Sequence, residues 1–209
     1  MSTTLVESTK PRTVEATIDQ DLPLEQRTDV TVGELEKMSL PMPAELYNGK
    51  VVFKMASHIH SVIQATIAGE IYIYLKKQPL GVVTTDENYR LWPERSNQSR
   101  VPDVSFVITQ RLPKDRTRYL PIAPDLAVEI LSPTDSFETT MEKVDEYLRQ
   151  GTRIVWVVIT STREVLVCTT AGKHTVTDAL TAPNLLPDFE LPVKTIFAGI
   201  EIQSHDSER

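Results

Sequence analysis

The stretch Asp125-Leu-Ala-Val-Glu-Ile-Leu131 predicts a buried β-strand, because it is an apolar run of strand length that contains one acid, Glu129. Alternation along a strand places Ala127, Glu129 and Leu131 on one face and their neighbours on the other. An unpaired carboxylate is costly to bury at such a position. Glu129 therefore needs a cation, a hydrogen-bond network or a raised pKa.

A second apolar run, residues 104–108, follows Pro102 and Asp103, so that Asp103 stands at the mouth of another expected strand. If the two strands are neighbours, the carboxylates of Asp103 and Glu129 can reach one point near the edge of the sheet. Two carboxylates, a carbonyl and several water molecules form an ordinary Mg²⁺ site. The alternative, from residue types alone, is a buried acid that pairs with an arginine.

Residues 135–150 predict a helix that ends before Gly151, a residue typical of the position after a helix. Its apolar stripe is expected at Phe137, Met141, Val144 and Leu148. On a helical wheel Lys143 lies away from the charged face and beside Tyr147. Its ammonium could reach over the end of the Glu129 strand and orient an attacking water. Alternatively, the lysine stem packs on the core and the ammonium reaches solvent.

The rest of the chain alternates between short strands and helices. Asn48-Gly49 predicts a hairpin turn, and an apolar stripe predicts a helix that ends in two lysines. The expected elements are strands 45–47 and 50–54, a helix over 58–77, a hairpin of 82–85 with 88–91, and strands 153–159, 164–168 and 174–176. This order favours an α/β fold with a mixed β-sheet flanked by helices.

The chain of 209 residues has the length of one domain. We expect a flexible arm over residues 1–30, a folded domain over 31–200 and a polar tail over 201–209. The single cysteine, Cys168, excludes an internal disulfide and a multi-cysteine zinc site. No apolar run approaches the roughly 18 residues that span a bilayer, and the first residues lack a secretory apolar segment. We therefore expect no membrane association and a cytoplasmic protein.

The net charge of −7 argues mildly against nucleic acid as a partner. The two ends, residues 1–30 and 161–209, contribute −3 each, and the part between them is nearly neutral. Residues 90–118, around Asp103, hold seven basic groups against three acidic ones. This local surplus is compatible with a phosphate substrate, although a solvated loop face would have the same composition.

Two other polar features allow simpler interpretations. His58 and His60 would lie about 200° apart on a helix, so they cannot chelate one ion together. Only His60 falls on the apolar stripe, where it is either a packing histidine or a group beside the acids. Ser132 precedes a helix in a pattern typical of capping, and no glycine-flanked serine elbow is present.

Several ordered blocks of the sequence, spread over residues 31–200, resemble the Uma-type family of putative restriction endonucleases, which belongs to the PD-(D/E)XK nuclease superfamily. The blocks are AELYNGKVVFKMASHIHSVI (44–63), RVPDVSFV (100–107), APDLAVEILSPTDS (123–136), KVDEYLRQGTRIVWVV (143–158) and LLPDFELPVKTIF (185–197). The resemblance implies a restriction-endonuclease-like core with an amino-terminal β-hairpin. It also implies an endonuclease that uses Mg²⁺, with Mn²⁺ as a substitute, to hydrolyse DNA phosphodiester bonds.

Asp103 matches the aspartate of the family's PD motif, and Glu129 matches the acid of its second strand. The superfamily's lysine two residues further on is Leu131 here, and Lys143 matches the helix lysine that replaces it in the family. The resemblance thus implies Asp103, Glu129 and Lys143 as catalytic residues and Asp103 and Glu129 as metal ligands. Glu45 matches the acid of the amino-terminal hairpin and could add a metal contact; otherwise it is a surface acid.

Two other functions remain open. The absent lysine at Leu131 and the acidic total favour a catalytically silent module that binds nucleic acid or another partner and keeps the nuclease fold. A metal-dependent hydrolase of nucleotides or other phosphate esters is the third reading. Fold analogy suggests a homodimer, since cleavage of both strands of a duplex commonly uses two active sites. No helix with a base-reading pattern is evident, which favours shape-based specificity.

Overall fold

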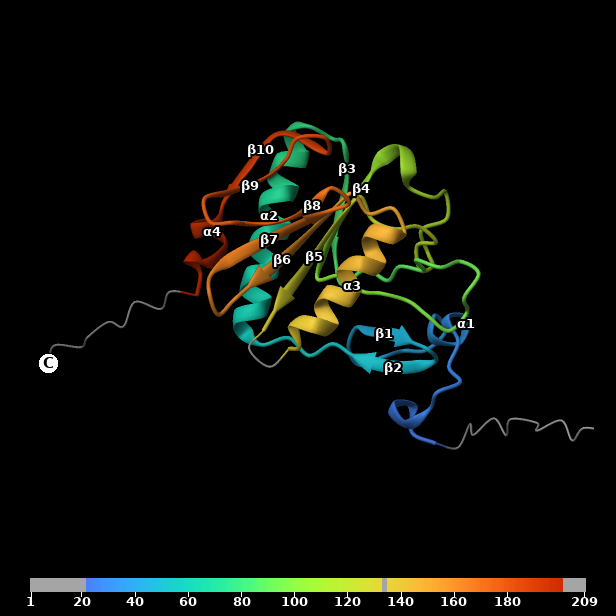
Figure 1. Cartoon of the computed structure of the whole chain (residues 1–209). Helices are drawn as coiled ribbons and strands as arrows, with labels where there is room; N and C mark the ends of the chain where they lie inside the picture. Colours follow the sequence, from blue (N-terminus) through green and yellow to red (C-terminus); the bar gives the residue numbers. More distant parts are fainter. Residues whose placement is uncertain (1–21, 133–134, 201–209) are drawn as a thin grey trace, which may run out of the picture.

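A six-stranded mixed sheet forms the centre of the molecule (Figure 1). The computed structural model describes residues 22–132 and 135–200. The sheet has the order β3-β4-β5-β6-β7-β8. Strands β5 and β6 pair in parallel, and every other pair of neighbouring strands in this sheet is antiparallel. The strands are β3 (Gly81–Thr85), β4 (Val104–Ile108), β5 (Leu126–Leu131), β6 (Ile154–Ile159), β7 (Glu164–Thr169) and β8 (Gly172–Val176). The expected mixed sheet is confirmed.

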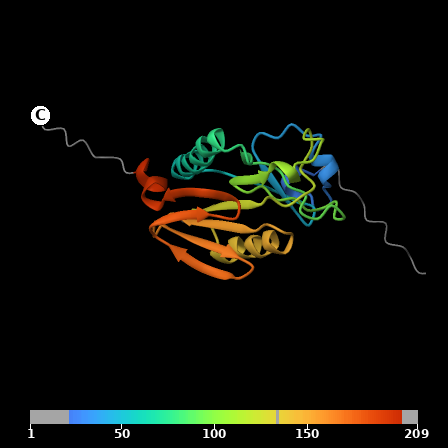
Figure 2. The ribbon, with the colours of Figure 1, turned by 90° about the horizontal axis from the view of Figure 1, so that it is seen from above.

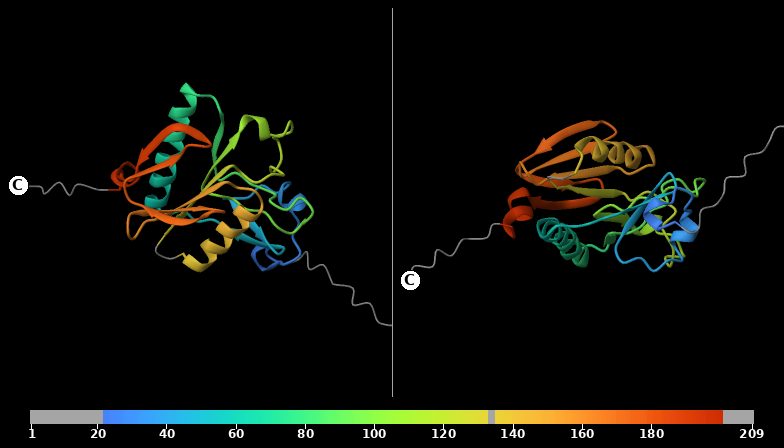
Figure 3. Two further views of the ribbon diagram at one scale, coloured as in Figure 1. Left: turned by 45° about the horizontal axis from the view of Figure 1, so that its top comes forward. Right: turned by 90° about the horizontal axis from the view of Figure 1, so that it is seen from below.

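Helices cover both faces of this sheet (Figure 2). The long helix α2 (His58–Lys77) lies on one face and α3 (Phe137–Arg149) on the other. The α2 face is completed by β9 (Ala179–Ala182), β10 (Leu186–Pro192) and α4 (Val193–Ala198), three elements that were not predicted. Figure 3 shows the same layers from two further directions.

The larger core lies between α2 and the sheet. Ile63, Ile67 and Ile71 are fully buried on the predicted stripe of α2 and pack on the apolar residues of the central strands. Trp156 of β6 is also fully buried, and its ring stacks on Phe189 at a centroid separation of 6.4 Å. Helix α2, the sheet and strand β10 are therefore held together around this tryptophan.

The buried face of α3 differs from the expected stripe. Ser136 caps the helix, and Thr140, Val144 and Tyr147 are its buried residues, whereas Phe137 is 50% exposed. The reason is that Tyr147, on this face, donates a hydrogen bond from its hydroxyl to the buried carboxylate of Glu129.

The predicted hairpin between residues 82–85 and 88–91 is wrong. Strand β3 pairs with β4 instead, with Gly81 opposite Ile108. A Cβ atom at Gly81 would collide with the carbonyl oxygen of Val107 and the ring of Phe106, so only glycine allows this approach. The intervening segment runs past the sheet and forms isolated bridges, such as the one between Tyr89 and Arg100.

The amino-terminal hairpin of β1 (Ala44–Tyr47) and β2 (Lys50–Phe53) lies beside α3 at one end of the sheet (Figure 1). Its turn places Asn48 and Gly49 at positive φ, as the sequence predicted. The Leu46 amide donates to the Ser99 carbonyl and the Ser99 amide to the Leu46 carbonyl, so β1 is docked against the segment that precedes β4.

The expected arm and tail fall mostly on residues 1–21 and 201–209, which lie outside the described residues. Residues 22–30 include the short turn η1 (Leu24–Gln26), and Val30 is fully buried against α1 (Val32–Leu35) and the hairpin. Another short turn, η2 (Thr109–Arg111), follows β4. Within the described ranges, no helix is both long and apolar enough to cross a membrane.

Candidate active site

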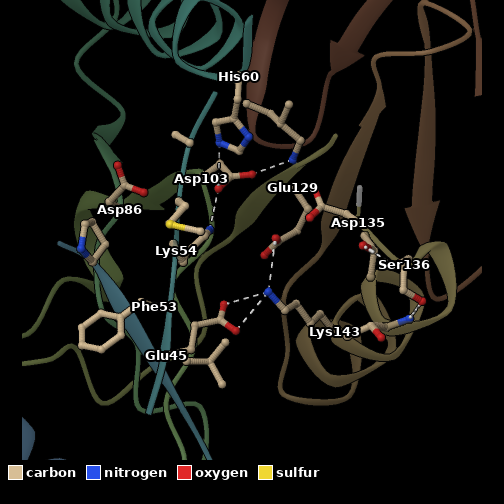
Figure 4. Close-up of a pocket in the computed structure, with 17 residues that line it drawn as sticks. Glu45, Phe53, Lys54, His60, Asp86, Asp103, Glu129, Asp135, Ser136 and Lys143 are labelled. Atoms are coloured by element: carbon tan, nitrogen blue, oxygen red, sulfur yellow. Dashed lines mark hydrogen bonds and ion pairs between the residues drawn. The ribbon is translucent and has the colours of Figure 1, made fainter. Parts of the chain in front are cut away.

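A cavity of about 370 Å³ lies between the amino-terminal hairpin, the start of α2 and helix α3 (Figure 4). It brings together all four predicted site residues: Glu45 of β1, Asp103 just before β4, Glu129 of β5 and Lys143 of α3. The ionisable residues that line it are Glu45, Lys54, His60, Asp86, Asp103, Glu129, Asp135 and Lys143.

Asp103 is positioned by the antiparallel pairing of β4 with β5. Its backbone amide donates to the Val128 carbonyl at 3.0 Å, and its Oδ2 accepts the Ile130 amide at 2.6 Å. The other oxygen, Oδ1, accepts the Lys54 ammonium at 2.5 Å and lies 3.3 Å from His60 Nε2. The side chain is 2% exposed, so both oxygens are held by protein groups.

The charge of Asp103 is strongly stabilised. Burial alone would raise the pKa of this carboxyl, but the ammonium of Lys54 and the hydrogen bond from His60 outweigh burial and lower the pKa to about 2. Asp103 is therefore a carboxylate at neutral pH, the protonation state that a metal ligand requires.

Among the three buried acids of the pocket, Glu129 has the charge that its neighbours stabilise least. Its Oε1 accepts the Tyr147 hydroxyl at 2.9 Å, while its Oε2 lies 3.8 Å from Lys143 Nζ. Burial raises the pKa of Glu129, and the attraction of Lys143 and Lys54 offsets this only in part. The buried charge of Glu129 is thus one that an additional cation would stabilise.

Lys143 is held mainly by Glu45. Its Nζ lies 3.0 Å from each carboxylate oxygen of Glu45, and the Val101 amide donates to Glu45 Oε1 at 3.2 Å. Burial raises the pKa of Glu45, but the attraction of Lys143 and Lys54 lowers this pKa by a larger amount, so that the net shift is downward. Glu45 is therefore not a surface acid, since it is 4% exposed. The ammonium of Lys143 does not simply reach solvent either, because it lies in the pocket and pairs with Glu45.

The second lysine of the pocket, Lys54, was not singled out from the sequence. It follows β2 directly, and its ammonium donates to the Val101 carbonyl at 2.6 Å as well as to Asp103. Asp103 and Glu129 thus face lysines, and the expected alternative of an arginine partner is wrong for both. The available signal was that Lys54 closes the hairpin that carries Glu45.

The two histidines have different surroundings. His60 lies beside the acids, as one of its two readings proposed, whereas His58 is exposed. One turn along α2, the Gln64 amide nitrogen donates to the Asp103 carbonyl and to Asp86 Oδ2, each at 2.8 Å. These contacts fix the backbone at Asp103 from the α2 side and were not predicted.

The basic segment around Asp103 is less available than its composition suggests. Arg100 is 2% exposed and its Nε donates to Glu146 at 2.7 Å, while Arg111 pairs with the buried Asp125 at 2.9 Å. These two arginines stabilise the fold. Four basic residues of the segment remain exposed: Arg95, Lys114, Arg116 and Arg118.

The donor chemistry of the pocket fits a hard divalent cation, because carboxylate oxygens are its preferred ligands. Among residues 22–132 and 135–200, however, no three Asp, Glu, His or Cys side chains form a ready-made metal cluster. Instead, the ammonium groups of Lys54 and Lys143 form ion pairs with Asp103 and Glu45. An ion would have to use oxygens that now face lysines.

Comparison with known proteins identifies the family. The Uma2 family model, described as "Putative restriction endonuclease", matches residues 33–194. The chain belongs to the Uma2 family. This confirms the resemblance seen in the sequence, and the matched range contains the hairpin, both buried acids and Lys143. No curated protein matches the chain significantly.

Among solved structures, a "putative nuclease belonging to DUF820" from Anabaena variabilis ATCC 29413 is similar to this Uma2 chain. The two share 24% sequence identity with a TM-score of 0.69, over 81% of this chain and 98% of the other. The likeness supports the predicted restriction-endonuclease-like fold with its amino-terminal hairpin.

Proposed function

We propose that this Uma2 protein is a Mg²⁺-dependent endonuclease that hydrolyses DNA phosphodiester bonds. The observation that carries the proposal is the pocket in which two buried acids from neighbouring strands, Asp103 and Glu129, meet two lysines. Carboxylates that hold a divalent ion, with an ammonium beside them, are a chemical arrangement suited to phosphoryl transfer.

In this proposal Asp103 and Glu129 hold the ion and Glu45 is available as a further ligand. The ion, when bound, would activate a water molecule and neutralise negative charge on the phosphate. Lys143 points its ammonium into the pocket within 3.8 Å of Glu129 Oε2, where it can orient water and stabilise negative charge. Glu45 keeps that ammonium in place through both of its oxygens.

The experiment that tests this function is nicking of supercoiled plasmid. We expect the purified protein to nick DNA with Mg²⁺ or Mn²⁺ and to lose this activity in EDTA. Glu129→Gln keeps the size of the side chain and removes its charge, so it should reduce nicking strongly. Cleavage by a purified Asp103→Ala/Glu129→Ala double variant at the wild-type rate would reject the assignment.

Two parts of the proposal need their own substrates and measurements. Parallel assays of duplex DNA, RNA and mononucleotides distinguish an endonuclease from a general phosphate-ester hydrolase. The proposed homodimer is checked by the molar mass in light scattering. The alternative of a catalytically silent module is favoured by the lysines that lie on the acids, and it predicts no nicking with any divalent ion.

A further inference from the structure

We propose that Lys54 competes with the divalent ion for the carboxylate of Asp103 and so weakens metal binding by the free protein. In this role Lys54 acts through Asp103 and is a positioning residue. The inference rests on the proposed function for the identity of the ion, but it concerns an equilibrium that is measurable without catalysis. Lys54 lies outside the residues that the sequence indicated as catalytic.

Protein groups occupy both carboxylate oxygens of Asp103. Oδ2 is used by the Ile130 amide, which belongs to the β-sheet and is fixed by it. Oδ1 accepts a hydrogen bond from Lys54 Nζ at 2.5 Å. A cation that takes Oδ1 as a ligand therefore meets an ammonium group at the same oxygen. Charge repulsion between the two is strong because both side chains are largely buried, with Lys54 17% and Asp103 2% exposed.

Lys54 is held less firmly by acids than Lys143 is. Lys143 is chelated by both oxygens of Glu45, so it keeps an ion pair whatever binds to Glu129. Among the residues that the structure describes, the ion pair of Lys54 is with Asp103, and its other hydrogen bond goes to the neutral Val101 carbonyl. Loss of Asp103 to an ion would leave this buried ammonium without an acid in direct contact, with only the longer-range attraction of Glu129 and Glu45.

The Val101 carbonyl keeps the Lys54 ammonium at the pocket even when Asp103 is engaged elsewhere. An anionic group in the pocket would then supply the missing counter-charge. Metal binding and phosphate binding therefore favour each other, and the free protein has a low affinity for the metal alone.

The test is calorimetric titration of the full-length chain with Mn²⁺ at neutral pH, without DNA. We expect Lys54→Met to bind Mn²⁺ about tenfold or more tightly than wild type, because one unit of positive charge beside the ion is removed. Lys54→Arg, which keeps the charge, should stay near wild type. The matched control is Lys50→Met on the same hairpin, an exposed lysine, and its affinity should change less than about twofold.

A merely structural role for Lys54 predicts the opposite sign, since a disturbed pocket loses metal affinity. Thermal unfolding of each variant shows that it is folded. Equal or weaker Mn²⁺ binding by folded Lys54→Met overturns the inference, and so does an absence of binding in that variant. Tighter binding that is abolished by adding Asp103→Asn supports it even if wild type cuts no DNA. Nicking by wild type without tighter binding in Lys54→Met leaves the proposed function intact and rejects this inference.

Discussion

Asp103→Asn is expected to lower the rate of Mg²⁺-dependent plasmid nicking at least about a hundredfold. Loss of a group that only supports a metal ligand typically costs tenfold to a hundredfold, and a ligand itself should cost no less. Asparagine has nearly the same shape, so the Ile130 amide keeps an acceptor while the negative charge that Lys54 and His60 stabilise is removed.

The control for this variant is Asp178→Asn, which removes the same charge from an exposed position after β8. We expect its nicking rate to stay within about twofold of wild type, since Asp178 is exposed, does not line the pocket, and carries a charge that salt screens. Initial rates are measured at saturating Mg²⁺. If Asp103→Asn retains a rate similar to that of Asp178→Asn, Asp103 does not hold the ion.

Trp156→Ala should give the largest loss of stability, about 3–5 kcal/mol in the free energy of unfolding. The ring is fully buried where α2, the sheet and β10 meet, and it stacks on Phe189. Alanine would leave a cavity that these rigid elements cannot close. Urea unfolding followed by circular dichroism measures the change.

The matched variant is Trp156→Phe. The indole nitrogen of Trp156 has no hydrogen-bond partner within the described part of the chain, so its removal breaks no bond. Phenylalanine keeps an aromatic ring for Phe189 and should cost less than half as much as alanine. Equal losses for the two variants, or a loss below about 1 kcal/mol for alanine, would contradict this account of the core.

The fold was predictable where the pattern of the chain is local. The period of α2 and the apolar runs of β4, β5 and β6 are set by burial of consecutive residues, and the structure has them where they were expected. The pairing of β3 was not predictable in this way, because residues 86–103 separate it from its partner β4 and no short turn links the two strands. The sequence near Tyr89 has strand propensity, but Tyr89 forms isolated bridges with Arg100 and Leu120 instead of a ladder with β3.

The site was predictable in part for the same reason. An acid inside an apolar strand is conspicuous, so Glu129 and Asp103 could be singled out from the sequence alone. Lys54 was not singled out, because its role depends on a contact with a residue 49 positions away. The surplus of basic residues in the segment around Asp103 overstated the positive charge available to a phosphate. Arg100 and Arg111 of this segment form ion pairs with Glu146 and Asp125.

The central claim is that Asp103 and Glu129 together hold a divalent ion. The most direct measurement is the anomalous scattering of Mn²⁺ in crystals of the wild-type protein soaked with the ion and a DNA oligonucleotide. We expect one strong peak within bonding distance of a carboxylate oxygen of each residue, and none at that place in Asp103→Asn crystals. A protein that nicks DNA in the crystallisation buffer but shows no Mn²⁺ at these two carboxylates would contradict the account.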